Sequence, residues 1–235
     1  TTGLDTGTGD GGTTDGTADT GTSPSETTDG GSTTDTGTLD TGTDTGTSAS
    51  DGSSHADTGD DSTEACTIAA ADLEAGDLVI TELMFNPGYG SDSSHEWMEV
   101  KNNRPPDECA INLDGLTIAD SAGETVLSAA ETIIEPGEYA VLAIGDGSSW
   151  TYPFSPTAFY GALAMNNTGD DITLLSGTTV LDQVPNYSLL SISEGHSFTL
   201  DASRESESAN DSIDSWCQAS EEIGATGDYG TPFYP

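Results

Sequence analysis

The stretch of sequence that indicates the fold reads LVITELMFNP from Leu78 to Pro87, and a second run, EWMEVKN, follows from Glu96 to Asn102. Both runs are short and largely apolar, and the first ends at the turn signal Asn86-Pro87-Gly88. Helical spacing of apolar residues is nearly absent from them. These two runs therefore predict β-strands.

Similar runs continue towards the C-terminus, separated by turn residues. They cover residues 113–120, 124–127, 138–144, 171–175, 179–184 and 197–200. Short strands spaced by roughly ten residues are typical of a sandwich or barrel. One helical turn fits residues 69–75 before Gly76 stops it. The fold class predicted from the pattern is all-β.

The first 64 residues have a different composition. Thr, Gly, Asp and Ser fill 55 of these 64 positions, and the tetrapeptide Asp-Thr-Gly-Thr recurs at irregular intervals. So few apolar residues cannot offset the entropy of ordering a chain. We expect a disordered, extended stalk over residues 1–64, a transition over 65–76 and a folded domain over 77–235. A glycosylated stalk is a variant of this prediction, and the irregular spacing argues against a calcium-binding repeat.

The chain is strongly acidic, with a formal net charge of −39. The stalk holds 14 acidic residues and no Lys or Arg, so the remaining 28 acids face three basic residues and give the rest a net charge of −25. Nucleic acid is an implausible partner, because its binding requires basic groups. Anionic membrane surfaces are disfavoured for the same reason, and no run is long enough for a membrane span. Cations, cationic polymers and basic patches on proteins remain possible partners.

The order of motifs resembles the lamin tail domain family. LVITELMFNP is similar to its opening strand, and EWMEVKN to its E-W-x-E-x-x-N strand. Residues 113–120 are similar to L-x-G-W-x-L, with Leu116 in the place of Trp. The P-G-x-Y turn of the family is similar to residues 134–139, and its N-x-G-D segment to residues 166–174. Its V-x-D-x-V strand is similar to residues 180–184, and its closing motifs are similar to residues 195–198 and 230–232. The stalk resembles those of exported proteins from myxobacteria and their relatives.

This resemblance implies an immunoglobulin-like β-sandwich and says little about activity. The residues that carry it are Glu82, Glu96, Trp97, Glu99, Asn102, Gly115, Pro136, Gly137, Asn167, Gly169, Asp170 and Asp182. Fold-forming roles are expected for them. Glu96 and Glu99 are three residues apart, so on a strand they face opposite sides, and one of them is expected to be buried and satisfied by backbone N–H groups.

Patterns that would indicate catalysis are missing from the sequence. No His-x-x-x-His or Cys-His spacing for zinc occurs, and no Gly-x-Ser-x-Gly motif marks a nucleophile. No pair of acids is singled out for glycosidase chemistry. We therefore expect no enzyme and no cofactor. A calcium site formed by Asp92 and Glu96, or by Asp170 and Asp171, is the one metal hypothesis, because loop carboxylates are calcium ligands.

Three cysteines leave the disulfide pairing open. Cys66 precedes the first strand and Cys217 follows the last, so a Cys66–Cys217 bridge joining the two ends of the domain is expected, with Cys109 free. A Cys109–Cys217 bridge is the competing pair. Either bridge fits an exported protein.

The sequence thus predicts a non-catalytic module, secreted or on the outer cell surface, that binds a protein or polysaccharide partner. An accessory domain of a larger secreted hydrolase and a structural subunit of a surface layer or filament are the alternatives. A signal sequence or a lipid anchor ahead of Thr1 is compatible with this prediction.

Overall fold

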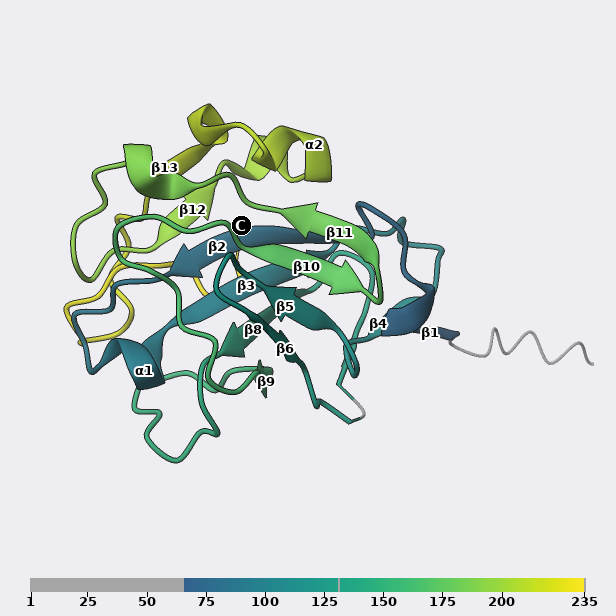
Figure 1. Cartoon of the computed structure of the whole chain (residues 1–235), viewed down its shortest axis with the longest axis horizontal. Helices are drawn as coiled ribbons and strands as arrows, with labels where there is room; N and C mark the ends of the chain where they lie inside the picture. The colour runs from purple at the N-terminus through teal and green to yellow at the C-terminus, as the bar shows by residue number, and fades with distance from the viewer. Residues whose placement is uncertain (1–65, 131, 235) are drawn as a thin grey trace, which may run out of the picture. The chain divides into compact units, whose positions relative to one another are not determined.

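The computed structural model describes residues 66–130 and 132–234 (Figure 1). The predicted stalk, residues 1–64, lies outside the described residues. The described part of the chain is built from short strands with a few single helical turns. The helical turns are η1 (Ala70–Asp72), α1 (Asp92–His95), η2 (Tyr187–Leu189), η3 (Ala202–Arg204), α2 (Glu207–Asn210) and η4 (Ile213–Ser215). The all-β prediction is confirmed.

The largest sheet has six strands in the order β13-β12-β2-β3-β8-β9. Their bounds are β2 (Leu78–Met84), β3 (Trp97–Asn102), β8 (Tyr139–Ala143), β9 (Ala158–Phe159), β12 (Phe198–Leu200) and β13 (Trp216–Gln218). β2 and β3 are antiparallel neighbours at its centre. The two runs that indicated the fold therefore form the middle of this sheet.

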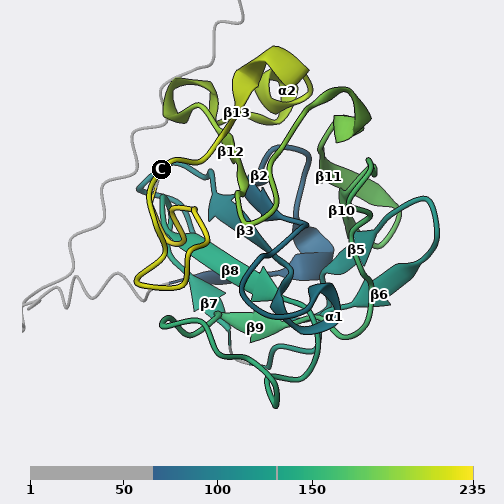
Figure 2. The same cartoon turned by 90° about the vertical axis from the view of Figure 1, so that its left-hand side faces the viewer.

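A four-stranded sheet lies against one face of the six-stranded sheet, and a small third sheet lies at one end. The four-stranded order is β11-β10-β5-β6, from β5 (Thr117–Ala119), β6 (Glu124–Val126), β10 (Thr173–Ser176) and β11 (Thr179–Gln183). The third sheet has the order β1-β4-β7, from β1 (Thr67–Ala69), β4 (Ala110–Asn112) and β7 (Ile133–Ile134). Figure 2 shows the two larger sheets as layers, with the C-terminal segment against the outer face of the six-stranded sheet. This arrangement is the immunoglobulin-like sandwich that the sequence predicted.

Apolar side chains fill both faces of the six-stranded sheet. The inner core lies between the two larger sheets and includes Leu78, Ile80, Phe198, Ile118, Leu174 and Leu181. An outer cluster on the opposite face includes Met84, Trp97, Val141, Tyr152 and Ile223, with Phe154 and Phe233 packed against it. Because both faces are covered, β2 is buried at every position.

A β-bulge in β2 changes which residues face the core. The pairing with β3 shifts between Ile80 and Glu82, so Thr81 is the extra residue. Ile80 and Leu83 both face the inner core although they are three residues apart. The bulge also places Glu82 directly opposite Glu99.

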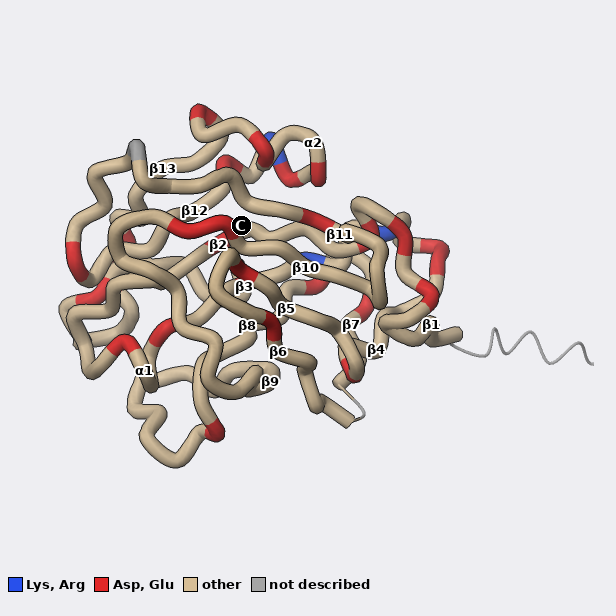
Figure 3. The backbone as a smooth tube through the Cα atoms, in the orientation of Figure 1, with Lys and Arg blue, Asp and Glu red and all other residues tan. Residues whose placement is uncertain are grey.

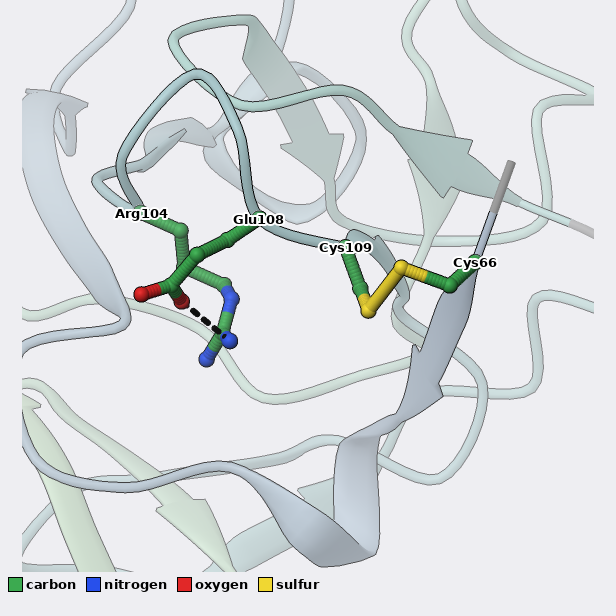
Figure 4. Close-up of a disulfide and its surroundings, with 4 residues drawn as sticks. All are labelled: Cys66, Arg104, Glu108 and Cys109. Carbon is green, nitrogen blue, oxygen red and sulfur yellow. Dashed lines mark ion pairs between the residues drawn. A yellow bond between two sulfur atoms is a disulfide. The ribbon is translucent and has the colours of Figure 1, made fainter. Parts of the chain in front are cut away.

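The predicted transition segment belongs to the folded domain. β1 pairs in parallel with β4, with Thr67 opposite Ala110. Cys66 and Cys109 each precede one of these paired positions, and a disulfide joins them, with the Arg104–Glu108 ion pair beside it (Figure 4). Their Cα atoms are 4.8 Å apart. Cys217 is free and exposed on β13. The predicted Cys66–Cys217 bridge and its Cys109–Cys217 competitor are therefore wrong, because parallel pairing of β1 and β4 brings Cys66 to Cys109.

Candidate functional site

Two buried carboxyl groups occupy the centre of the outer face of the six-stranded sheet. Glu82 on β2 and Glu99 on β3 are cross-strand partners, and both side chains are almost fully buried. The hydroxyls of Ser197, directly before β12, and of Thr199 on β12 donate to Glu82, and the Thr81 hydroxyl donates to Glu99 over 2.7 Å. Burial raises the pKa of both groups, and that of Glu99 reaches about 8 because Glu82 also lies beside it.

These carboxyl groups hold the segment Gly230–Tyr234, which we call the C-terminal strap. The Thr231 amide donates to Glu82 over 2.9 Å, and the Phe233 amide donates to Glu99. A side chain at position 230 would come within 2.9 Å of Glu82 Oε1, so glycine permits this close approach. The strap is thus fixed to the sheet by the buried pair.

The loops around the strap are fixed by another buried carboxylate, Asp228. Its oxygens accept hydrogen bonds from the amides of Gly88 and Tyr89, at 3.1 and 3.0 Å, and from the Tyr152 hydroxyl. Tyr152 stacks on Phe154, with ring centroids 5.4 Å apart. Asp228 therefore joins three loops into one unit next to the outer cluster.

A groove is lined by the strap, by the loop that carries Pro153 and Phe154, and by residues 221–224. It has a volume of about 610 Å³, and its lining is Pro153, Phe154, Glu221, Glu222, Ile223, Gly224, Gly230, Thr231, Pro232 and Tyr234. Tyr234 is 70 % exposed, which is unusual for an aromatic side chain. Phe154 in turn packs edge-on against Phe233 of the strap, at 6.0 Å between centroids. Prolines and aromatic rings therefore make the walls, and two glutamates supply the charge.

The basic residues of the chain are all engaged outside the groove. Lys101 pairs with Glu205, Arg104 pairs with Asp77 and Glu108, and the Arg204 guanidinium donates to Ser215. No Lys or Arg follows Arg204 in the sequence. Figure 3 shows acidic positions spread over the domain and the few basic ones among them. Within the part of the chain that the structure describes, no Lys or Arg therefore pairs with the carboxylates of the groove.

The other acidic motif residues serve the fold. Glu96 accepts a hydrogen bond from the Met165 amide over 2.8 Å, and burial raises its pKa to about 8. Glu96 and Glu99 do face opposite sides, but both are buried, whereas one was expected. Asp182 accepts hydrogen bonds from the Ile80 amide at the bulge and from the side-chain amide of Asn210. Burial raises the pKa of Asp182 to about 7. Their partners come from segments distant in sequence.

The remaining motif residues shape turns and strand ends. Asn102 donates to the Ile134 carbonyl and accepts from the Arg104 amide. Gly115 and Gly137, which follows Pro136, have φ near +85° and suit left-handed turns. Trp97 lies in the outer cluster. Gly169 has φ +128° and lies against Ser188, so these residues have fold-forming geometry.

The four acids of the calcium hypothesis do not form a ligand set. Asp92 accepts a hydrogen bond from the side-chain amide of Asn167, and Glu96 accepts one from the backbone amide of Met165. Asp170 accepts hydrogen bonds from the backbone amides of Asn166 and Asp171. Within residues 66–130 and 132–234, no three His, Cys, Asp or Glu side chains are placed to hold a metal ion. The loop carboxylates bind backbone and amide N–H groups instead, so the structure gives the calcium prediction no support.

Residues that sequence reasoning missed include Asp228, Asn210, Phe154 and both glutamates of the groove. Asp228 lies in the run Gly227-Asp228-Tyr229-Gly230, and the glycines at both ends of this run were the available signal. Nothing local marks Phe154 as a groove residue, because its neighbours there come from positions 221–234.

A comparison against protein families finds a match over most of the described residues. The model of the Lamin Tail Domain matches residues 72–216. The chain belongs to the lamin tail domain family. No significant match was found among curated proteins or among solved structures. The matched span of this lamin tail domain ends before the strap and most of the groove, so those features lie outside the part that the family model describes. Its described helices are all too short to cross a membrane.

Proposed function

We propose that this lamin tail domain protein is a non-catalytic module that acts outside the cell and binds a partner through the groove. The observation that carries the proposal is the position of the groove. Figure 1 shows β1, where the chain enters the domain, at one end, and the C-terminal loops at the other. A domain attached through its N-terminal side would present this groove outward, and residues 1–64 would serve as the spacer.

The buried acids support a non-catalytic role. Raised pKa values are common at catalytic sites, but Glu96, Glu99 and Asp182 are enclosed by the fold and accept hydrogen bonds from backbone amides. Both ring nitrogens of His95 contact hydroxyl groups, at Ser94 and Thr151. These groups stabilise loops and strands, and none of them lines the groove.

The disulfide supports an extracellular location. Cys66–Cys109 closes a loop of 43 residues at the start of the domain. Structural disulfides persist in oxidising compartments and are rare in the cytosol. An exported protein therefore fits this bond best.

Site-specific photocrosslinking tests the proposal. The full chain would carry benzoylphenylalanine in place of Tyr234, and a control would carry it in place of Val126, which is 61 % exposed on β6 of the other sheet. On intact cells that export the protein, we expect a discrete adduct from position 234 and none from position 126. Absence of an adduct at 234, or equal adducts at both positions, contradicts the proposal.

A further inference from the structure

We propose that the groove binds an extended protein segment that carries Arg or Lys beside Pro or aromatic residues. This inference rests on the proposed function and names the chemistry of the partner. It goes beyond the family assignment, because most residues that line the groove come after residue 216, where the family match ends.

The walls of the groove fit an extended chain. Pro153 and Phe154 line the groove together with Pro232 and Tyr234 of the strap. Aromatic and proline-lined grooves recognise extended, proline-containing segments, because such segments lose little conformational entropy on binding. The exposed Tyr234 ring offers an apolar face to the side chains of such a segment.

The charge of the groove selects for basic residues. Glu221 and Glu222 are both exposed, and Glu222 is held in place by the Gly227 amide, which donates to its Oε1 over 3.0 Å. The three basic residues of the chain pair elsewhere. An Arg or Lys of the partner would supply the missing positive charge. Arg would also stack on the Tyr234 or Phe154 ring.

The groove is preformed, which lowers the entropic cost of binding. Glu82 and Glu99 fix the strap to the sheet. On the other side, Gly224 approaches Pro153 so closely that a side chain at position 224 would lie 2.8 Å from its Cγ. Both walls are therefore positioned before a partner arrives.

Selection from a displayed random dodecapeptide library against the full chain tests the inference. The counter-selection uses the double variant Glu221→Gln/Glu222→Gln, which keeps 26 of the 28 acids in residues 65–235. Peptides that bind only through the overall negative charge also bind this variant, so the counter-selection discards them. Both positions are exposed, so the double variant should keep the melting temperature of the wild type. We expect enriched peptides that combine Arg or Lys with Pro or aromatic residues.

Fluorescence anisotropy with an enriched peptide then measures its affinity for the wild type and the variants. We expect at least a tenfold loss of affinity in the double variant and in Phe154→Ala, and unchanged affinity in the matched control Glu124→Gln/Glu135→Gln, which removes two exposed acids elsewhere. A chitosan hexamer serves as the basic polysaccharide probe. No enrichment, equal binding to the double variant, or tighter binding of chitosan overturns the inference. If crosslinking at Tyr234 succeeds while these peptides fail, the proposed function stands and this inference falls.

Discussion

Glu82 and Glu99 lie directly opposite one another on neighbouring strands, and both carboxyl groups are buried beneath the C-terminal strap. Like charges in directly opposed positions destabilise a sheet. The pair is tolerated because burial keeps a proton on the site and because hydroxyl and amide groups donate to its oxygens. The same pair positions one wall of the groove, so a feature of the fold also shapes the proposed binding surface.

The first prediction concerns the pH dependence of stability. Burial raises the pKa of Glu99 from 4.5 to about 8. Between those pH values the folded state holds a proton that the unfolded chain has released, so the free energy of unfolding falls as pH rises through this window. Glu96 and Asp182 act in the same direction. We expect the melting temperature, measured by circular dichroism, to be higher at pH 5 than at pH 9.

The variant Glu99→Gln isolates the contribution of this site. Its amide is neutral at every pH and keeps an oxygen that can accept from the Phe233 amide. At pH 9 the melting temperature should exceed that of the wild type by about 5 °C or more, and the two should converge towards pH 5. Glu135→Gln, at an exposed position, is the control and should follow the wild type. Parallel pH profiles for wild type and Glu99→Gln would disprove the role of Glu99.

The sheets were largely predictable, because their central strands alternate or are continuously apolar. Each of the eight predicted runs overlaps a strand in the structure. β1, β4, β7 and β9 were missed, and so was β13, since Trp216-Cys217-Gln218 has no pattern of its own. It becomes a strand by pairing with β12 and by stacking of Trp216 on Phe198, at 4.6 Å between centroids. Short strands of this kind form because of tertiary contacts, which a local sequence pattern does not reveal.

The second prediction concerns the disulfide. Trypsin cleaves after Lys101 and Arg204 and not before Pro105, so each of the three tryptic peptides contains one cysteine. In an unreduced digest we expect the peptides holding Cys66 and Cys109 to be linked and the Cys217 peptide to be alkylated by iodoacetamide. Mass spectrometry distinguishes the three pairings. A linked peptide that contains Cys217 would refute the pairing in the structure.

Loss of this bridge should destabilise the domain. The loop of 43 residues predicts a cost of about 2–4 kcal/mol for Cys109→Ser. Cys217→Ser is the matched control, because that thiol is free, and it should leave the melting temperature unchanged. Equal melting temperatures for the two variants would contradict a stabilising role for the bridge.

The candidate site was far less predictable than the fold. Two acids inside apolar runs, Glu82 and Glu99, signalled buried carboxyl groups that need donors. The donors are amides of the strap, more than 130 residues later in the chain. The groove is assembled from loops with no strand pattern, so its residues become recognisable when the fold brings them together.

The third prediction concerns Gly169. Its φ of +128° is strained for any residue with a side chain, and a methyl group there would overlap Ser188, whose Cα would be 2.7 Å away. We expect Gly169→Ala to lower the stability by about 3 kcal/mol or more. Gly115→Ala is the comparison, because φ is also positive but nothing lies within 4 Å. It should cost about 1–2 kcal/mol. Urea unfolding measures both, and an equal loss would show that the contact with Ser188 has no influence.

The fourth prediction concerns Asp182, which supports the bulge in β2. Its Oδ2 accepts from the Ile80 amide over 2.6 Å and from Asn210 over 2.7 Å. Asp182→Ala would leave the Ile80 amide buried without an acceptor, at a cost of about 2–4 kcal/mol. Asp182→Asn keeps an oxygen for this amide and should lose less than half as much. Gln183→Ala, at the exposed neighbouring position, is the control. Hydrogen exchange adds a local readout: the Ile80 amide should exchange at least tenfold faster in Asp182→Ala, whereas unchanged exchange with wild-type stability would show that the bulge does not depend on this carboxylate.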